Sequence, residues 1–209
     1  MSSDSSRQFD APQLPSNDNP TPDPNRKRMR HFNEPGHLHF MTFSCYRRLQ
    51  LLTNDLFRCW LAETLNKALI VHDVQLSGFV FMPEHVHLLV WPRKEIYSIA
   101  DFQHSFKRPF SLRIKNRLES INSPLLDTLT IRERPGKMTF RFWQEGGGHD
   151  LNVWSEKYIW TKLEYMHTNP VQRRLVCSPD KWRWSSWKRW HRPELPLDPE
   201  LPNMSVLKL

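Results

Sequence analysis

The stretch GFVFMPEHVHLLVW, residues 78–91, decides the architecture that the sequence predicts. Two apolar runs are joined by a Pro-Glu link, which is short enough for an antiparallel hairpin of two strands. Side chains alternate across a strand, so His85 and His87 share one face of the second run. The opposite, buried face then belongs to Val86, Leu88 and Val90. Two imidazoles on one face of an apolar strand indicate a metal site.

Strand and helix patterns continue on both sides of this hairpin. Residues 37–46 are rich in aromatic and β-branched side chains, which is typical of a strand. Asn54 or Thr53 caps a predicted helix with apolar residues at helical spacing. A second helix is expected over 96–118, with a kink or break at Pro109.

The second half of the chain adds a strand and a helix to this pattern. Residues 119–138 look like an irregular connection, and residues 139–143 form a fourth strand candidate. A third helix is expected over 153–168, ended by Pro170. The order β-α-β-β-α-β predicts an α+β fold, a ferredoxin-like antiparallel sheet with helices on one face.

Composition limits the classes of protein and of partner. The chain has 209 residues and a net charge of +8, which favours a polyanionic partner such as nucleic acid. Its longest apolar runs are too short for a bilayer, and the N-terminus lacks a signal-peptide core. Three widely spaced cysteines favour neither a disulfide framework nor a thiolate zinc site. A cytoplasmic protein is therefore expected, with no membrane partner.

Three regions are predicted from composition. Residues 1–32 are poor in large apolar side chains and end in a basic cluster, as expected for a disordered tail. Residues 33–192 are predicted to form one domain with a Trp-rich C-terminal element, and residues 193–209 a second tail. Gly146–Gly148 is expected to be a flexible joint within the domain.

The third predicted helix carries two further candidates. Tyr165 and Asn169 are four residues apart and therefore lie on one helical face. A tyrosine can be a covalent nucleophile toward phosphorus, and an amide oxygen suits a hard divalent ion. Structural interpretations compete with both. An Asn before a Pro is also a good N-cap, and Tyr165 could pack half-buried. His37 and His39 have the same spacing as the preferred histidine pair.

Together these residues resemble the single-tyrosine HUH transposases, and more closely their REP-associated tyrosine transposase branch. HUH means histidine, large hydrophobic residue, histidine, here His85-Val86-His87. The resemblance covers roughly residues 35–190. It rests on the ordered set HFMTF (39–43), MPEHVH (82–87), FWQE (142–145), LEYMHTNPV (163–171) and WRWSSW (182–187).

The resemblance implies a site and a reaction. Tyr165 would be the nucleophile, and His85, His87 and Asn169 would hold Mg²⁺ or Mn²⁺. The enzyme would cleave and rejoin single-stranded DNA, in hairpin or palindromic repeats, through a 5′-phosphotyrosine. It would act near the bacterial nucleoid as a monomer, although relatives that exchange helices form dimers. Candidate DNA contacts are Lys107, Arg108, Arg113, Lys115, Lys162, Arg173 and Arg174.

Three interpretations of function, and two of the Trp-rich element, remain open at this stage. The first function is the transposase or nuclease, and the second is a domesticated DNA-binding protein of the same fold without cleavage. The third is a metal-dependent hydrolase that uses water, which would give the Tyr-x-x-x-Asn-Pro helix no role. Trp184 and Trp187 either stack on DNA bases or pack against the sheet.

Overall fold

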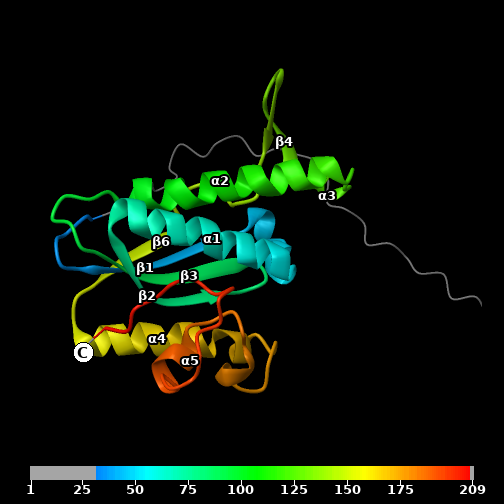
Figure 1. Cartoon of the computed structure of the whole chain (residues 1–209). Coiled ribbons are helices and arrows are strands. Elements are labelled where there is room, and N and C mark those ends of the chain that lie inside the picture. Colours follow the sequence, from blue (N-terminus) through cyan, green and yellow to red (C-terminus); the bar gives the residue numbers. More distant parts are fainter. Residues whose placement is uncertain (1–31, 208–209) are drawn as a thin grey trace, which may run out of the picture.

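A four-stranded antiparallel sheet forms the centre of the chain, with helices on both of its faces (Figure 1). The computed structural model describes residues 32–207, so all but the last residue of the expected N-terminal tail, 1–32, lies outside the described residues, as does its basic cluster at 26–30. Within that part of the chain, no helix is long and apolar enough to cross a membrane.

The sheet has the strand order β2-β3-β1-β6. Its strands are β1 (Leu38–Ser44), β2 (Val74–Phe81), β3 (His85–Pro92) and β6 (His149–Val153). Strands β2 and β3 form the predicted hairpin, and β1 pairs with β3 on its other side. This is the ferredoxin-like order, so the predicted fold class is confirmed.

One face of the sheet packs against α1 (Asp55–His72) and α2 (Ile99–Ser120). The Asn54 side chain accepts a hydrogen bond from the Leu56 N–H and caps α1, as predicted. Helix α2 continues through Pro109 without the expected break. The core on this face includes Met41, Phe43, Val86, Leu88, Val90, Phe102 and Phe106.

The prediction that helices cover only one face is wrong. Helix α4 (Glu156–Gln172) packs on the opposite face, and α5 (Trp187–His191) lies in the same outer layer (Figure 1). The physical reason is that β2 and β3 are apolar on both faces, and the second face must also be removed from water. This second core contains Leu38, Phe40, Val80, Met82, Leu89, Val153, Ile159, Leu163 and Met166.

Gly78 allows α4 to approach the sheet closely. A Cβ atom at this position would lie 2.8 Å from Leu163 Cδ2 and 3.2 Å from Met166 Sδ. Real Cβ atoms do not approach other heavy atoms at the first of these distances. The glycine in the quoted stretch therefore sets the spacing between β2 and the helix that carries Tyr165.

The fourth strand of the sheet is β6, not the predicted strand at 139–143. Residues 137–140 instead form β5 (Lys137–Phe140), which pairs with β4 (Thr130–Arg134) in a separate hairpin after the short α3 (Leu125–Leu129). The Pro135-Gly136 pair favours a tight turn, with Gly136 at φ +75°, and so brings β5 back onto the adjacent β4. The expected irregular connection at 119–138 is therefore mostly ordered.

The region expected to be a flexible joint is closely packed at one position. Gly148 has a φ of +81°, and a Cβ atom there would lie 2.2 Å from the Thr42 carbonyl oxygen. This glycine is thus required where the chain turns against β1 to begin β6.

The Trp-Ser-Ser element covers the outer edge of β2. Phe81 N–H donates to the Trp184 carbonyl (2.9 Å), and Ser186 N–H donates to the Phe79 carbonyl (2.9 Å). Trp184 is buried, and its indole N–H donates to Asp55 Oδ1 at 2.7 Å. Core packing is thus the correct interpretation of Trp184, and the element protects a strand edge. Farther along, Arg183 pairs with Asp198, so part of the expected C-terminal tail contacts the domain.

His167 ties α4 to this element. Its Nε2 lies 2.7 Å from the Ser186 hydroxyl, which also accepts from the Phe79 N–H at 2.9 Å. Burial, with a smaller contribution from the charge of His191, lowers the pKa of His167 to about 3. The imidazole is therefore neutral in the folded protein at neutral pH.

This lowered pKa predicts acid destabilisation. Between pH 3 and the ordinary histidine pKa of about 6.5, the unfolded chain binds the proton that folded His167 excludes, so stability falls as pH falls. At pH 4.5 the loss of stability attributable to His167 should be about 2.5 kcal/mol relative to pH 7.5. Urea unfolding of wild type and His167→Gln at both pH values measures it. Equal pH dependence in the two proteins would contradict this role.

Candidate active site

His85 and His87 lie on the α4 face of β3, and their rings meet. The two Nε2 atoms are 3.0 Å apart, and the ring centroids are separated by 4.6 Å at a nearly perpendicular angle. Both side chains are buried. The sheet alternation predicted from the sequence is therefore confirmed: Val86, Leu88 and Val90 belong to the core under α1 and α2.

The other nitrogen of each ring has its own partner. His87 Nδ1 is hydrogen-bonded to Thr42 Oγ1 (2.8 Å), because β1 places Thr42 directly opposite His87. His85 Nδ1 donates to Glu84 Oε1 (3.0 Å), whose other neighbour is the Arg48 guanidinium at 3.5 Å. The Glu84 carboxylate can only accept, so this contact places the His85 proton on Nδ1. The Nε2 atoms of the two rings face each other, and they are the ring nitrogens available to a metal ion.

Burial keeps both imidazoles neutral. It lowers the pKa of His87 to about 3, with a smaller lowering effect from His85. Burial also lowers the pKa of His85, although Glu84 acts in the opposite direction. A neutral imidazole is the form that binds a metal ion.

Asn169 reaches the same point from α4. Its Nδ2 lies 3.3 Å from His87 Nε2, and its Oδ1 is buried without a hydrogen-bond partner within residues 32–207. The expectation that Pro170 ends the helix is wrong, because α4 continues to Gln172. Asn169 is therefore inside the helix, and the alternative interpretation of this residue as an N-cap does not apply.

Tyr165 lies one helical turn before Asn169 and beside His87. Its ring centroid is 5.6 Å from that of His87 and 6.0 Å from that of Phe40, which itself stacks on His87. The side chain is 46% exposed. A hydroxyl held at the edge of a buried histidine pair and open to solvent is accessible to a large substrate.

These residues fit a divalent metal ion. Two neutral imidazole nitrogens and the unpartnered amide oxygen of Asn169 supply the donor types that such ions accept. A buried amide oxygen without a donor is costly unless a cation or a bound group satisfies it. The described residues contain no group of three His, Cys, Asp or Glu side chains that could hold a metal, so Asn169 is needed to complete this set.

The competing pair, His37 and His39, does not form a second site of this kind. His39 lies on the other face of the sheet, where its Nδ1 contacts Asp150 (2.8 Å) and its Nε2 contacts the Tyr97 hydroxyl (2.8 Å). His37 stacks on Trp154 with ring centroids 5.3 Å apart. Both nitrogens of His39 are used, and the two imidazoles have different partners.

The structure separates the candidate DNA-binding residues into two groups. Lys162 and Arg173 belong to α4 and its end, where the Lys162 ammonium lies 5.3 Å from the Phe40 ring centroid. Arg174 follows in a left-handed conformation. The others lie on α2, across the sheet from Tyr165; this second group is Lys107, Arg108, Arg113 and Lys115.

Three residues of the α2 group have partners, and one of them, Lys115, pairs with Glu119 on the same helix (3.3 Å). The Lys107 ammonium lies over the rings of Phe43 and Trp143, and burial lowers its pKa to about 8. Arg113 pairs with Glu63 and lies over Trp60. Lys107 and Arg113 are therefore engaged within the fold, which the basic spacing of the helix did not indicate.

Sequence reasoning missed the residues that orient the site. Thr42, Glu84 and Phe40 each contact a histidine or Tyr165. Glu84 directly precedes His85, so its adjacency was a usable signal. Thr42 and Phe40 were placed in a predicted strand, but their contacts depend on the register between β1 and β3.

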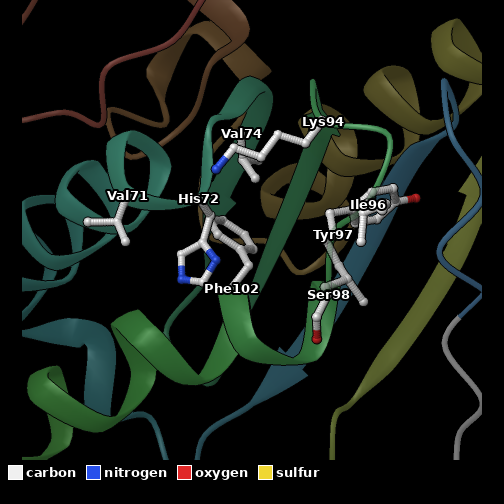
Figure 2. A pocket seen from close by; sticks show the side chains of 9 residues that line it. Val71, His72, Val74, Lys94, Ile96, Tyr97, Ser98 and Phe102 are labelled. Atoms are coloured by element: carbon white, nitrogen blue, oxygen red, sulfur yellow. The ribbon is translucent and has the colours of Figure 1, made fainter.

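A pocket at the far end of the sheet contains none of these residues. It has a volume of about 110 Å³ and lies between the end of α1 and the start of α2 (Figure 2). Val74 in its wall pairs with Pro92, at the opposite end of β3 from His85. At about 3.3 Å per residue, that is roughly 20 Å from the histidine pair.

The contact between Glu84 and His85 predicts an effect on metal binding. Glu84→Ala should weaken Mn²⁺ binding by about 10- to 100-fold, because the His85 ring loses the partner that orients it. Glu84→Gln, whose amide oxygen still accepts a hydrogen bond, should restore part of the affinity. Calorimetric titration with Mn²⁺ measures both. Wild-type affinity in Glu84→Ala would show that Glu84 does not orient the ring.

Comparisons with known proteins agree with this architecture. Residues 34–128 match the family described as "Transposase IS200 like". The fold is similar to a solved structure of a REP-associated tyrosine transposase bound to a REP hairpin, with a TM-score of 0.61 and 18% identity over 88% of this chain and 94% of that chain. A candidate transposase from Deinococcus radiodurans has a TM-score of 0.43 and 19% identity over 68% and 96%. No curated protein matches the chain by sequence.

Proposed function

Because residues 34–128 match the IS200-like transposase family, we propose that the chain cleaves and rejoins single-stranded DNA with Tyr165 as the nucleophile. The observation that supports this most is the convergence of Tyr165, His85, His87 and Asn169. The Tyr165 ring is 5.6 Å from the His87 ring, and Asn169 is 3.3 Å from His87 Nε2.

The proposed reaction exchanges one phosphodiester for another. The Tyr165 oxygen attacks a phosphorus atom of the DNA backbone, and its proton leaves to solvent. The bond from phosphorus to the 3′-oxygen breaks, which yields a 5′-phosphotyrosine and a free 3′-hydroxyl. A 3′-hydroxyl then attacks the phosphotyrosine, re-forms the DNA backbone and restores the phenol. Because bond energy is conserved in the intermediate, no nucleotide cofactor is required.

His85, His87 and Asn169 would hold the divalent ion. When bound, such an ion supplies Lewis-acid polarisation of the scissile phosphate. Imidazole nitrogens suit Mn²⁺ better than Mg²⁺, which prefers oxygen ligands, and we propose Mn²⁺ or Mg²⁺ in that order. Thr42 and Glu84 fix the two rings, so the protein contributes a preformed ligand set.

We propose hairpin DNA, such as a REP element, as the substrate. The similar solved structure is of a protein bound to a REP hairpin, and the fold likeness covers 88% of this chain. Lys162 lies near Tyr165 through their shared neighbour Phe40, and Arg173 and Arg174 follow at the end of the same helix; we propose all three as contacts to the phosphates of the substrate. The proposed place of action is chromosomal DNA in the bacterial cytoplasm.

We propose that a monomer is sufficient for cleavage. Tyr165 and the histidines belong to one chain and are in ring contact, so a single copy holds the complete residue set. A dimer that exchanges helices would be needed only if the tyrosine lay far from its own histidines. Sedimentation with the hairpin substrate should therefore give one protein per DNA.

The test is covalent capture of DNA. The full chain is incubated with a labelled DNA hairpin that carries single-stranded flanks, with Mn²⁺, with Mg²⁺ or with chelator. Metal-dependent formation of a denaturation-resistant protein–DNA adduct, with release of a 3′-hydroxyl strand, is the expected result. Hairpin binding without cleavage would favour the domesticated DNA-binding protein.

A further inference from the structure

The β4–β5 hairpin, residues 130–140, projects from the end of the α2 layer (Figure 1). Most of its side chains are exposed, including the large apolar Met138 at 61%. A two-stranded ribbon this exposed contributes little to the core. Its root, however, is well anchored, because Leu129 is fully buried and the Arg141 N–H donates to the Leu129 carbonyl at 2.7 Å. The hairpin is therefore an ordered projection.

The charge of this hairpin is basic and partly uncompensated. Residues 130–141 contain four basic side chains and one acidic side chain, Glu133. The Glu133 carboxylate is occupied by Lys137, Thr139 and Arg141, and these contacts lower its pKa. Within residues 32–207, Arg132 and Arg134 form no ion pair, and both are exposed. Two arginines remain available for an anionic partner.

The root of the hairpin is joined to the candidate active site. Two backbone hydrogen bonds join the residues after the hairpin to the end of β1. The Tyr46 N–H donates to the Phe142 carbonyl (2.8 Å), and the Gln144 N–H donates to the Ser44 carbonyl (2.9 Å). Ser44 pairs with His85 across the sheet. Arg47 and Arg48, which follow Tyr46 in the sequence, are exposed. The end of β1 thus connects the histidine pair with the root of the hairpin, and two exposed arginines follow it.

We propose that the β4–β5 hairpin is a DNA-binding arm that lies in a groove of the duplex stem of the substrate, with Arg132 and Arg134 on its phosphates. This rests on the proposed function, which supplies a substrate with a stem. The major groove of B-form DNA, about 12 Å wide, admits a two-stranded ribbon. The major groove of A-form RNA is too narrow for side chains to enter, so the arm should distinguish DNA from RNA stems.

The test compares Arg132→Ala/Arg134→Ala with a control that removes two charges elsewhere. Lys67→Ala/Lys94→Ala is matched in charge; Lys67 lies on exposed α1 surface, and Lys94 follows β3 at the end of the sheet opposite His85. Three probes are used in fluorescence anisotropy: a blunt DNA hairpin without flanks, an unpaired strand that contains the cleavage site, and an RNA hairpin of the same sequence.

The arginine variant should bind the blunt DNA hairpin roughly tenfold more weakly, and the slope of log affinity against log salt should fall by about 1 to 2. The unpaired strand should be bound and cleaved as by wild type. The lysine control should match wild type on all probes. If the arginine variant bound the blunt DNA hairpin with wild-type affinity, the proposed DNA-binding arm would be wrong. It would also be wrong if the wild-type protein bound the RNA hairpin as tightly as the DNA hairpin and the variant lost the same affinity for both.

The two proposals fail in different ways. The blunt hairpin has no scissile flank, so its binding is measured without cleavage. If the wild-type protein bound this probe but formed no Tyr165 adduct with the cleavable substrate, the proposed function would be contradicted and the proposed DNA-binding arm would not. An adduct formed normally, with arginine-independent hairpin binding, would contradict the arm alone.

Discussion

Tyr165→Phe should abolish the covalent protein–DNA adduct, with a loss of at least about 10³-fold in the rate of strand cleavage. The substitution removes only the phenolic oxygen, and the ring contacts with Phe40 and His87 can be retained. Metal affinity and hairpin affinity should therefore remain at wild-type values. The measurement is adduct formation on a denaturing gel with labelled hairpin DNA and Mn²⁺.

Tyr158→Phe is the matched control for this experiment. Tyr158 lies on the same helix, two turns away, and is similarly exposed, but its ring contacts Trp154 and not His87. This variant should form the adduct normally. Cleavage by Tyr165→Phe with a 5′-phosphate product and no adduct would show that water is the nucleophile. An adduct lost only in Tyr158→Phe would transfer the role to that residue.

His87→Ala should weaken Mn²⁺ binding by at least about 100-fold and remove metal-dependent cleavage, because one of three proposed ligands is lost and Asn169 loses its contact. The fold should persist, since Val86, Leu88 and Val90 still fill the core on the other face of β3. Calorimetric titration with Mn²⁺ gives the affinity, and circular dichroism verifies the fold.

His104→Ala is the control for this substitution. His104 is an exposed imidazole on α2, on the other side of the sheet from the histidine pair. Its removal should leave Mn²⁺ affinity unchanged and so exclude nonspecific binding by surface histidines. If His87→Ala retained wild-type affinity, the assignment of the metal site to this pair would be wrong.

Several elements could be predicted because their signals are local. The alternation in residues 85–90 placed the two histidines on one face and the three apolar side chains on the other, and both placements are confirmed. The spacing of Tyr165 and Asn169 placed both on one face of a helix. The order of strands and helices predicted the ferredoxin-like sheet.

Two other elements differ from the prediction, because a second influence outweighed the local pattern on which the prediction rested. The short aromatic run at 139–143 resembles a sheet strand, but the Pro-Gly turn makes its first residues pair locally with β4. A proline normally ends a helix, yet α4 continues past Pro170, where its packing against β2 and β3 supports it. In both cases, context outweighed a correct local rule.

The sequence by itself determined the candidate reactive residues and the face of the strand or helix on which each lies, because alternation and helical spacing are properties of neighbouring residues. Only the tertiary structure decided that these faces meet. His87 contacts Thr42, which is 45 residues away in the sequence, and Asn169, which is 82 residues away. Such contacts depend on strand register and on the placement of α4 over the second apolar face of the sheet. This packing buries both imidazoles and keeps them neutral. It also brings the Tyr165 ring beside that of His87.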